Sequence, residues 1–201
     1  PVTWMAEKLS SSPDQEAIHA SLTDLLEAIQ QGKSDRGITI PFDIDKDKFI
    51  IFGDQHKGGK DAADDFMPAE KNYLKALQHY YNEAFTFLSL GDSEELWENT
   101  PKVAIEKNRL SLLEEAKFLQ SDRYYRIFGN HDLEWKYPIQ QSLFLKPIFG
   151  DKLKIHEGIC LKTKYNGKDY SILLAHGHQG DKKSDGNPLS TWVVAALWTP
   201  V

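Results

Sequence analysis

The sequence has a single cysteine, Cys160, so no disulfide bond can form within the chain. One free thiol fits a reducing, intracellular setting, and we expect the protein in the cytoplasm. Long apolar runs are also missing, which excludes a transmembrane helix of about 20 residues. The apolar stretch at residues 2–6 is short and is followed by charges, so it does not resemble a signal peptide. No membrane span is therefore expected.

An excess of positive charge is missing as well, since the formal net charge is -6. General nucleic-acid binders usually carry a basic field, so this balance argues against that class. Bound divalent cations would cancel part of the negative charge, and a nucleic acid stays open as a substrate. Internal repeats, low-complexity tracts and linkers are absent. The 201 residues predict a single domain, with an N-terminal helical extension over 1–37 and a core over 38–201.

Hydrophobic spacing predicts a first helix that starts near Ser12 and Pro13 and stops at Gly32. Further helices are predicted over 68–81 and 102–119, and 134–149 is expected to be helical or irregular. In the helix over 102–119, four apolar residues are expected to face inward: Val103, Leu110, Leu113 and Leu119.

Short apolar runs predict strands between these helices, over 38–40, 49–52, 85–90 and 123–128. Two more strands, over 153–163 and 170–175, are joined by Asn166-Gly167, which is a strong hairpin signal. Strands and helices thus alternate along the chain, and an antiparallel pair of strands follows them. This order predicts an α/β layered fold with a mixed sheet.

Four polar clusters each follow directly after a predicted strand. They are Gly53-Asp54-Gln55-His56, Gly91-Asp92, Gly129-Asn130-His131-Asp132 and His176-Gly177-His178. A Gly-Asp pair is usually a turn, and a lone histidine is usually structural, but four such clusters at successive strand ends are hard to explain in that way. Ligands of open α/β sheets bind beyond the carboxyl ends of the strands. The clusters would therefore meet in one small volume, with these side chains together: Asp54, His56, Asp92, Asn130 and His176.

Carboxylate, imidazole and amide donors together suit Mn, Fe or Zn, whereas a set of oxygen donors alone would favour Mg or Ca. One carboxylate between two metals about 3.5–4 Å apart makes a hydrolytic two-metal site. The sequence therefore predicts two divalent metal ions as cofactors. Such a pair binds a phosphate and lowers the pKa of a shared water.

This series of motifs resembles the calcineurin-like metallophosphoesterase superfamily, over about residues 49–180. That group includes purple acid and Ser/Thr phosphatases, cyclic-nucleotide phosphodiesterases, nucleases and bacterial UDP-diacylglucosamine hydrolases. The resemblance implies an α/β/β/α-type layered fold. It also implies that Asp54 and His56 hold one metal, that Asp92 bridges, and that Asn130 and His176 hold the second.

By the same resemblance, His131 is not a ligand but a catalytic residue, which donates to the phosphate or protonates the leaving oxygen. Asp132 would then orient its ring. Glu95 stands where many relatives carry an aspartate, and we expect it to support the site without coordinating.

One element of the family pattern is missing, because relatives end with Gly-His-x-His and this chain has no such motif. His176-Gly177-His178 follows the hairpin strand and fits the preceding motif instead. The apolar segment over 192–198 looks like an unfinished helix. We therefore expect a fragment in which the C-terminal part of the fold is missing, with His178 as a candidate substitute ligand.

The loop over 57–65 has two interpretations: a solvated mobile loop, or one in which Lys57 or Lys60 contacts substrate phosphate. Trp97 and Trp135 follow the second and third motifs and could either wall the site or pack in the core. Cys160 lies in a predicted strand without a paired base, which disfavours a thiol nucleophile.

The leading hypothesis is a metallophosphoesterase that uses metal-activated water on a phosphate ester of unknown identity. The alternative is a non-catalytic interaction domain, or inactive fragment, that keeps the fold. Metal content together with hydrolysis of p-nitrophenyl phosphate and its bis ester would separate the two.

Overall fold

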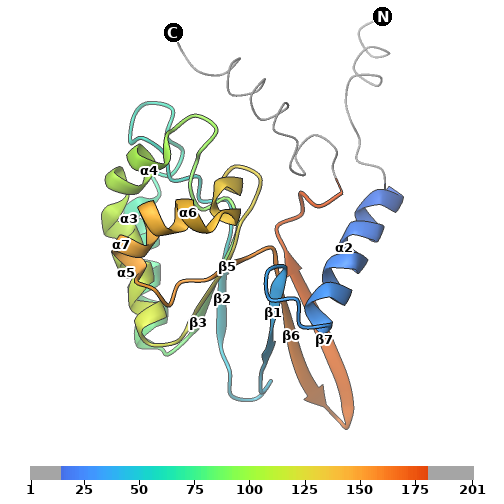
Figure 1. The fold of residues 1–201 in the computed structure, drawn as a ribbon. Helices are drawn as coiled ribbons and strands as arrows, with labels where there is room; N and C mark the ends of the chain where they lie inside the picture. Colours follow the sequence, from blue (N-terminus) through green and yellow to red (C-terminus); the bar gives the residue numbers. More distant parts are fainter. Residues whose placement is uncertain (1–14, 181–201) are drawn as a thin grey trace, which may run out of the picture.

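The computed structural model describes residues 15–180, which form two β-sheets lying face to face between helices (Figure 1). One sheet is parallel, with the strand order β2-β3-β4-β5. Its strands are β2 (Phe49–Phe52), β3 (Thr86–Leu90), β4 (Tyr124–Ile127) and β5 (Ile155–His156). The other sheet is mixed, because β6 pairs in parallel with β1 and antiparallel with β7. Its strands are β1 (Gly37–Pro41), β6 (Gly158–Tyr165) and β7 (Lys168–Ala175). An α/β fold with a mixed sheet is thus confirmed, but the hairpin belongs to a second sheet.

The chain changes sheets at Glu157, so the single strand predicted over 153–163 is wrong. β5 pairs with β4 in the parallel sheet, whereas β6 pairs with β1 in the mixed one. The backbone N–H groups of Glu157 and Gly158 both donate to the carbonyl of Arg36, at 3.0 and 3.2 Å. The Glu157 carboxylate also accepts from the Arg36 guanidinium at 2.5 Å. These bonds fix the place where the strand leaves one sheet for the other.

The predicted hairpin turn is confirmed. β6 and β7 pair up to Tyr165 and Lys168, which leaves Asn166 and Gly167 as the two turn residues. Both turn residues have positive φ, 49° and 76°. Two-residue hairpin turns of this kind match the twist of the strands, and they select Asn-Gly for that reason.

The first helix, α2 (Gln15–Gln30), covers the outer face of the mixed sheet. Leu25 and Ile29 are buried against Cys160 of β6. Gly32 ends the helix as predicted, with φ of 78°. The predicted start at Ser12 and Pro13 lies outside the described residues.

The remaining helices gather on the outer face of the parallel sheet (Figure 1). They are α3 (Glu70–Asn82), α4 (Pro101–Lys107), α5 (Arg109–Gln120), α6 (Pro138–Gln140) and α7 (Lys146–Phe149), with a 3-10 turn η1 (Leu133–Lys136) and a π-helical turn η2 (Gln141–Leu145). A large apolar core lies under them, and Leu88, Ile127 and Ile159 form a second core between the two sheets. The layers therefore run helix, sheet, sheet, helices. Among residues 15–180, no helix is long and apolar enough to cross a membrane.

The helix predicted over 102–119 is two helices, which meet at the buried Asn108. The Asn108 side-chain amide donates to the carbonyls of Gly58 and Ala104, at 2.8 and 2.9 Å. This break changes which residues face the sheet. Leu119 is buried as predicted, but the inward orientation predicted for three others is wrong, since they are exposed: Val103, Leu110 and Leu113.

Candidate metal centre

The four polar clusters meet at one end of the two sheets, as the sequence predicts. β2, β3 and β4 are neighbours in the parallel sheet, so their carboxyl ends share one edge. β7 lies in the other sheet and brings His176 to the same place. There the His176 Nδ1 atom lies 2.9 Å from the carbonyl oxygen of Leu90, the last residue of β3.

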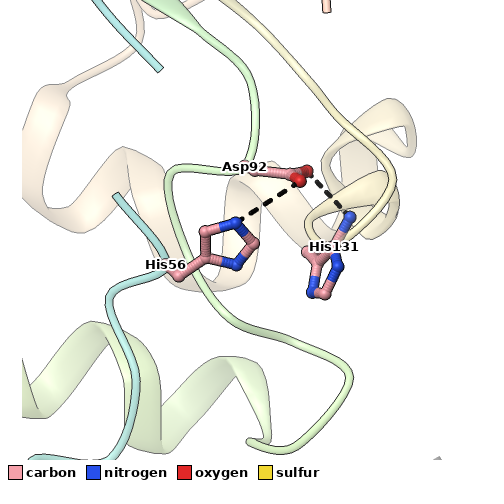
Figure 2. Close-up of side chains that lie close together, drawn as sticks. All are labelled: His56, Asp92 and His131. Atoms are coloured by element: carbon pink, nitrogen blue, oxygen red, sulfur yellow. Dashed lines mark hydrogen bonds and ion pairs between the residues drawn. The ribbon is translucent and has the colours of Figure 1, made fainter. Parts of the chain in front are cut away.

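Two groups of side chains in this volume have the spacing to hold a metal ion, and Asp92 belongs to both. One group is His56, Asp92 and His131, and the other is Asp54, Asp92 and His176. Within each group the candidate donor atoms lie within 4.8 Å of one another. Figure 2 shows the Asp92 carboxylate between the His56 ring and the backbone N–H of His131, which donates to it at 2.8 Å.

The distances converge on one oxygen, Oδ2 of Asp92. It lies 3.7 Å from Nε2 of His56 and 3.1 Å from Nε2 of His176. The same His176 nitrogen lies 3.1 Å from the Asn130 side-chain oxygen. Oδ1 of Asp54 is 3.9 Å from Nε2 of His56. The structure therefore brings together all five side chains that the sequence predicts as ligands.

The electrostatics of this volume favour a cation. Burial of the His176 ring disfavours its protonated form, but the hydrogen bond to Asp92 and the charges of Asp92 and Asp54 raise its pKa to about 9. Burial likewise opposes ionisation of Asp92, yet contact with His176 holds the pKa of that carboxyl below its usual value. A proton on His176 thus balances the negative charge of the nearby carboxylates. A bound metal ion would supply that positive charge instead and would displace the proton.

Three of the candidate ligands have strained backbones. Asp54, His56 and Asp92 have φ of 56°, 49° and 49°, in the left-handed region. Asp and His tolerate this region better than bulkier residues do, but the conformation still costs energy. Strain of this kind collects at functional sites, where the surrounding structure holds it in place.

Position 129 requires glycine because Asp92 lies very close to its backbone. A Cβ atom at Gly129 would stand 2.1 Å from Oδ1 of Asp92 and 2.7 Å from its backbone nitrogen. At Gly53, the corresponding glycine after β2, a Cβ would meet only Leu90, at 3.4 Å or more.

We expect Gly129→Ala to displace Asp92, and so to lower metal content and to cost about 1–3 kcal/mol of unfolding free energy as an overpacked site. Gly53→Ala is the matched control and should change neither. Metal per chain and urea denaturation of both variants measure the difference. Equal behaviour of the two variants would show that Asp92 has room to move.

His131 is held by Glu95, and not by Asp132 as predicted. Oε2 of Glu95 lies 2.7 Å from Nδ1 of His131 and 2.8 Å from Nδ1 of His56. Burial opposes the charge of Glu95, but hydrogen bonds from His131 and His56 lower its pKa to about 2. An ionised carboxylate therefore fixes both rings. The expectation that Glu95 supports the site agrees with this geometry.

Trp97 forms one wall of the site. Its ring stacks on His131 with centroids 3.8 Å apart and an angle of 19° between the planes. Its indole N–H donates to the backbone carbonyl of Asn130 at 2.8 Å. Trp135, the other tryptophan considered from the sequence, is fully buried and donates to Glu94 at 2.8 Å. Trp97 therefore walls the site, whereas Trp135 packs in the core.

Asp132 is buried beneath the candidate site, where it holds the backbone of the loops after β3 and β4. Its carboxylate accepts from the backbone N–H groups of Gly129 at 2.6 Å, Ser93 at 3.0 Å and Asp92 at 3.3 Å. It also pairs with Arg126 at 3.0 Å, and the Arg126 guanidinium in turn bonds Glu94. Asp132 thus positions Asp92 through the main chain.

The prediction that Lys57 contacts substrate phosphate is wrong, because this side chain is fully buried. Its ammonium donates to Ser93 Oγ at 2.7 Å and pairs with Glu115 at 2.8 Å. Lys60 is also engaged, with Nζ 2.7 and 2.8 Å from the two carboxylate oxygens of Glu70. Hydrogen bonds and ion pairs hold the loop at Lys57, Lys60 and Asp64, while Asp61, Ala62, Ala63 and Asp65 are exposed to solvent.

His178 is buried and lies against other rings, with centroids 6.0 Å from Phe128 and 5.6 Å from His176. Neither of the groups among residues 15–180 that could hold a metal ion includes it. The substitute-ligand hypothesis gains no support from this placement. The expected fragment boundary, and the segment over 192–198, lie outside the described residues.

Sequence reasoning missed the buried charged residues under the site, and it gave Asp132 a different role. These residues are Lys57, Glu94, Glu115, Arg126 and Asp132. A signal for them was present in Arg126, a charge in the middle of the strand predicted over 123–128. Such a charge needs a buried partner of opposite sign.

Comparisons of the chain with family models, with curated proteins and with solved structures found no match. The functional argument therefore rests on the residues and on their geometry.

Proposed function

We propose that this chain is a metallophosphoesterase of the calcineurin-like type, which hydrolyses a phosphate ester with two divalent metal ions, Mn, Fe or Zn. The observation that carries the proposal is the position of Asp92. Its Oδ2 atom lies between His56 and His176, and it belongs to both metal-binding groups. A carboxylate in that position is what a two-metal site requires. The order of layers, helix, sheet, sheet, helices, agrees with the α/β/β/α arrangement of that superfamily.

The donor set fits the metals. Asp54 and His56 would hold one ion, Asn130 and His176 the other, and Asp92 both. The ordered contact of Glu95 with Nδ1 of His56 leaves Nε2 of that ring free for coordination, as outer carboxylates commonly do for metal-binding histidines. Two divalent cations held there would supply positive charge for the phosphate oxygens and would lower the pKa of a water that serves as the nucleophile.

The chain's own residues supply the proton for the leaving group. Glu95 accepts from Nδ1 of His131, so Nε2 of that ring is the atom that can carry a proton toward the substrate. As the bond between phosphorus and the leaving oxygen breaks, that proton passes to the oxygen. Trp97 covers one face of the ring and fixes its plane.

Asp92→Asn is expected to lower metal content at both sites, because it removes charge from the one ligand they share. Loss of an outer hydrogen-bond partner already costs about 10–100-fold in metal affinity, so loss of this carboxylate should cost at least as much. Asp54→Asn is the matched control: it removes the same charge and should chiefly empty one site. Elemental analysis after dialysis measures both.

The same preparations are assayed with p-nitrophenyl phosphate and its bis ester. Equal metal content in wild type and Asp92→Asn would rule out the bridging role. A wild-type chain that holds two metals and hydrolyses neither ester would count against the proposed activity.

A further inference from the structure

A cavity of about 580 Å³ opens beside His131, between the loop over 57–65 and the segment over 95–99. His56 and His131 form part of its wall. Gly58 and Gly59 form another part, against the side chain of Asn99. A Cβ at Gly59 would stand 2.7 Å from Oδ1 of Asn99. Because glycine has no Cβ, the loop can pack closely against Asn99 at this point. The cavity therefore has a built wall, and it borders the candidate metal centre at His56 and His131.

Apart from the two histidines, the ionisable side chains that line this cavity are all carboxylates. Among the described residues, no lysine or arginine lines the cavity. The nearby ammonium groups are committed elsewhere, since Lys57 is fully buried with Glu115 and Lys60 is paired with Glu70. An anionic group that entered would find no compensating charge there.

Some of these carboxylates already have partners, and others do not. Asp61 accepts from one backbone N–H group and Asp64 from three, and Glu95 holds the two histidine rings. Asp65 and Glu98 also line the cavity; both are exposed and have no hydrogen-bond or ion-pair partner within residues 15–180. Two carboxylates are thus free to interact with whatever occupies the cavity.

The position of His131 says which part of a substrate would lie here. If His131 protonates the leaving oxygen, the leaving group lies next to His131, and this cavity borders that side chain. The phosphate itself would stay with the metals.

We propose that the cavity selects a leaving alcohol that carries a positively charged nitrogen, and that it disfavours anionic leaving groups such as nucleotides. Asp65 and Glu98 are the specificity-determining residues. This inference rests on the proposed hydrolysis of phosphate esters and adds the substrate class. Attraction to two exposed carboxylates is modest, so a preference of about 10-fold is expected over a neutral alcohol, and it shrinks as salt is added.

Three phosphate monoesters of nearly equal size test the charge preference: O-phosphoethanolamine, hydroxyethyl phosphate and phosphoglycolate. Their leaving groups carry an ammonium, a hydroxyl and a carboxylate. Binding of each ester to the Mn²⁺-loaded chain is measured by calorimetry, which needs no turnover. We expect affinity to fall in that order, by about 10-fold for each step.

The double variant Asp65→Asn with Glu98→Gln should bring the three affinities within about 3-fold of one another, and it should leave binding of the hydroxyethyl ester unchanged. Asp169→Asn removes one exposed acid from β7, outside the lining of the cavity, and should keep the full preference.

Equal affinities, tightest binding of phosphoglycolate, or a preference that survives the double variant would each overturn the inference. Absence of binding by all three esters would do so as well. The proposed hydrolysis is judged separately, by release of p-nitrophenol. Turnover without the charge preference would remove only the specificity, whereas the preference without turnover would remove only the catalysis.

Discussion

His131→Ala is expected to slow hydrolysis of a phosphate ester by about 10²–10⁴-fold while the chain keeps its metals. The reason is the geometry of the ring, which is held by Glu95 at Nδ1 and covered by Trp97. Those contacts orient Nε2 as a proton donor, and removal of a positioned acid costs a rate factor of that order. Turnover and metal per chain are measured on the same preparation.

Two other results would change the role of His131. Full turnover would remove it from the mechanism. Loss of metal would make it a ligand, as its grouping with His56 and Asp92 allows. His79→Ala, which removes an exposed imidazole at the end of α3, controls for the loss of a histidine as such and should change neither quantity.

Arg126→Met should lower the free energy of unfolding by about 3–5 kcal/mol, because it leaves two buried carboxylates without their partner. Arg126 is fully buried and pairs with both Glu94 and Asp132. Methionine carries no charge, so the loss comes from the missing guanidinium, and Glu94 keeps only its longer pair with Lys57, at 3.8 Å. Urea denaturation gives the value, with stability extrapolated to water.

The control for Arg126 breaks an ion pair at the surface. Lys152→Met removes the exposed pair with Asp122 and should leave stability nearly unchanged. Adding Glu94→Gln to Arg126→Met should restore part of the loss, since it removes one of the stranded charges. Similar stability of the two single variants, or no recovery in the double variant, would mean that the buried network contributes little.

The sequence predicts those parts of the fold that depend on neighbouring residues. The Asn166-Gly167 turn is an example, because its backbone geometry selects these two residues directly. The gathering of Asp54, Asp92 and Asn130 is predictable for a related reason: parallel neighbouring strands place their carboxyl ends at one edge.

Features that depend on distant contacts were not predictable. Glu157 marks the change of sheet only because Arg36, far earlier in the chain, binds it. Asn108 breaks the helix because its side chain reaches the carbonyl of Gly58. Apolar spacing along the chain holds no information about either partner, which is why the buried face of α5 was assigned wrongly.

The candidate site likewise has features that the sequence predicts and others that depend on distant contacts. Its candidate ligands could be read from their positions after strands, and Glu95 was expected to support the site, but the groups that Asp132 and Glu95 contact could not be read. Asp132 stands next to His131 in sequence, yet it faces the backbone of Gly129 and Ser93 below. Glu95 comes from a different loop and reaches two histidines at once. Adjacency in sequence was a poor guide to which carboxylate meets which ring.

The parallel pairing of β1 with β6 has a consequence for the order of folding. Gly37 pairs with Gly158, so the mixed sheet closes a loop that contains the whole parallel sheet. Long loop closures are entropically costly and slow, whereas β2, β3 and β4 pair with strands next to them in the chain. During synthesis Asp54, Asp92 and Asn130 emerge well before β7 does. His176 arrives with β7, so the donor set is complete only after the second sheet has docked.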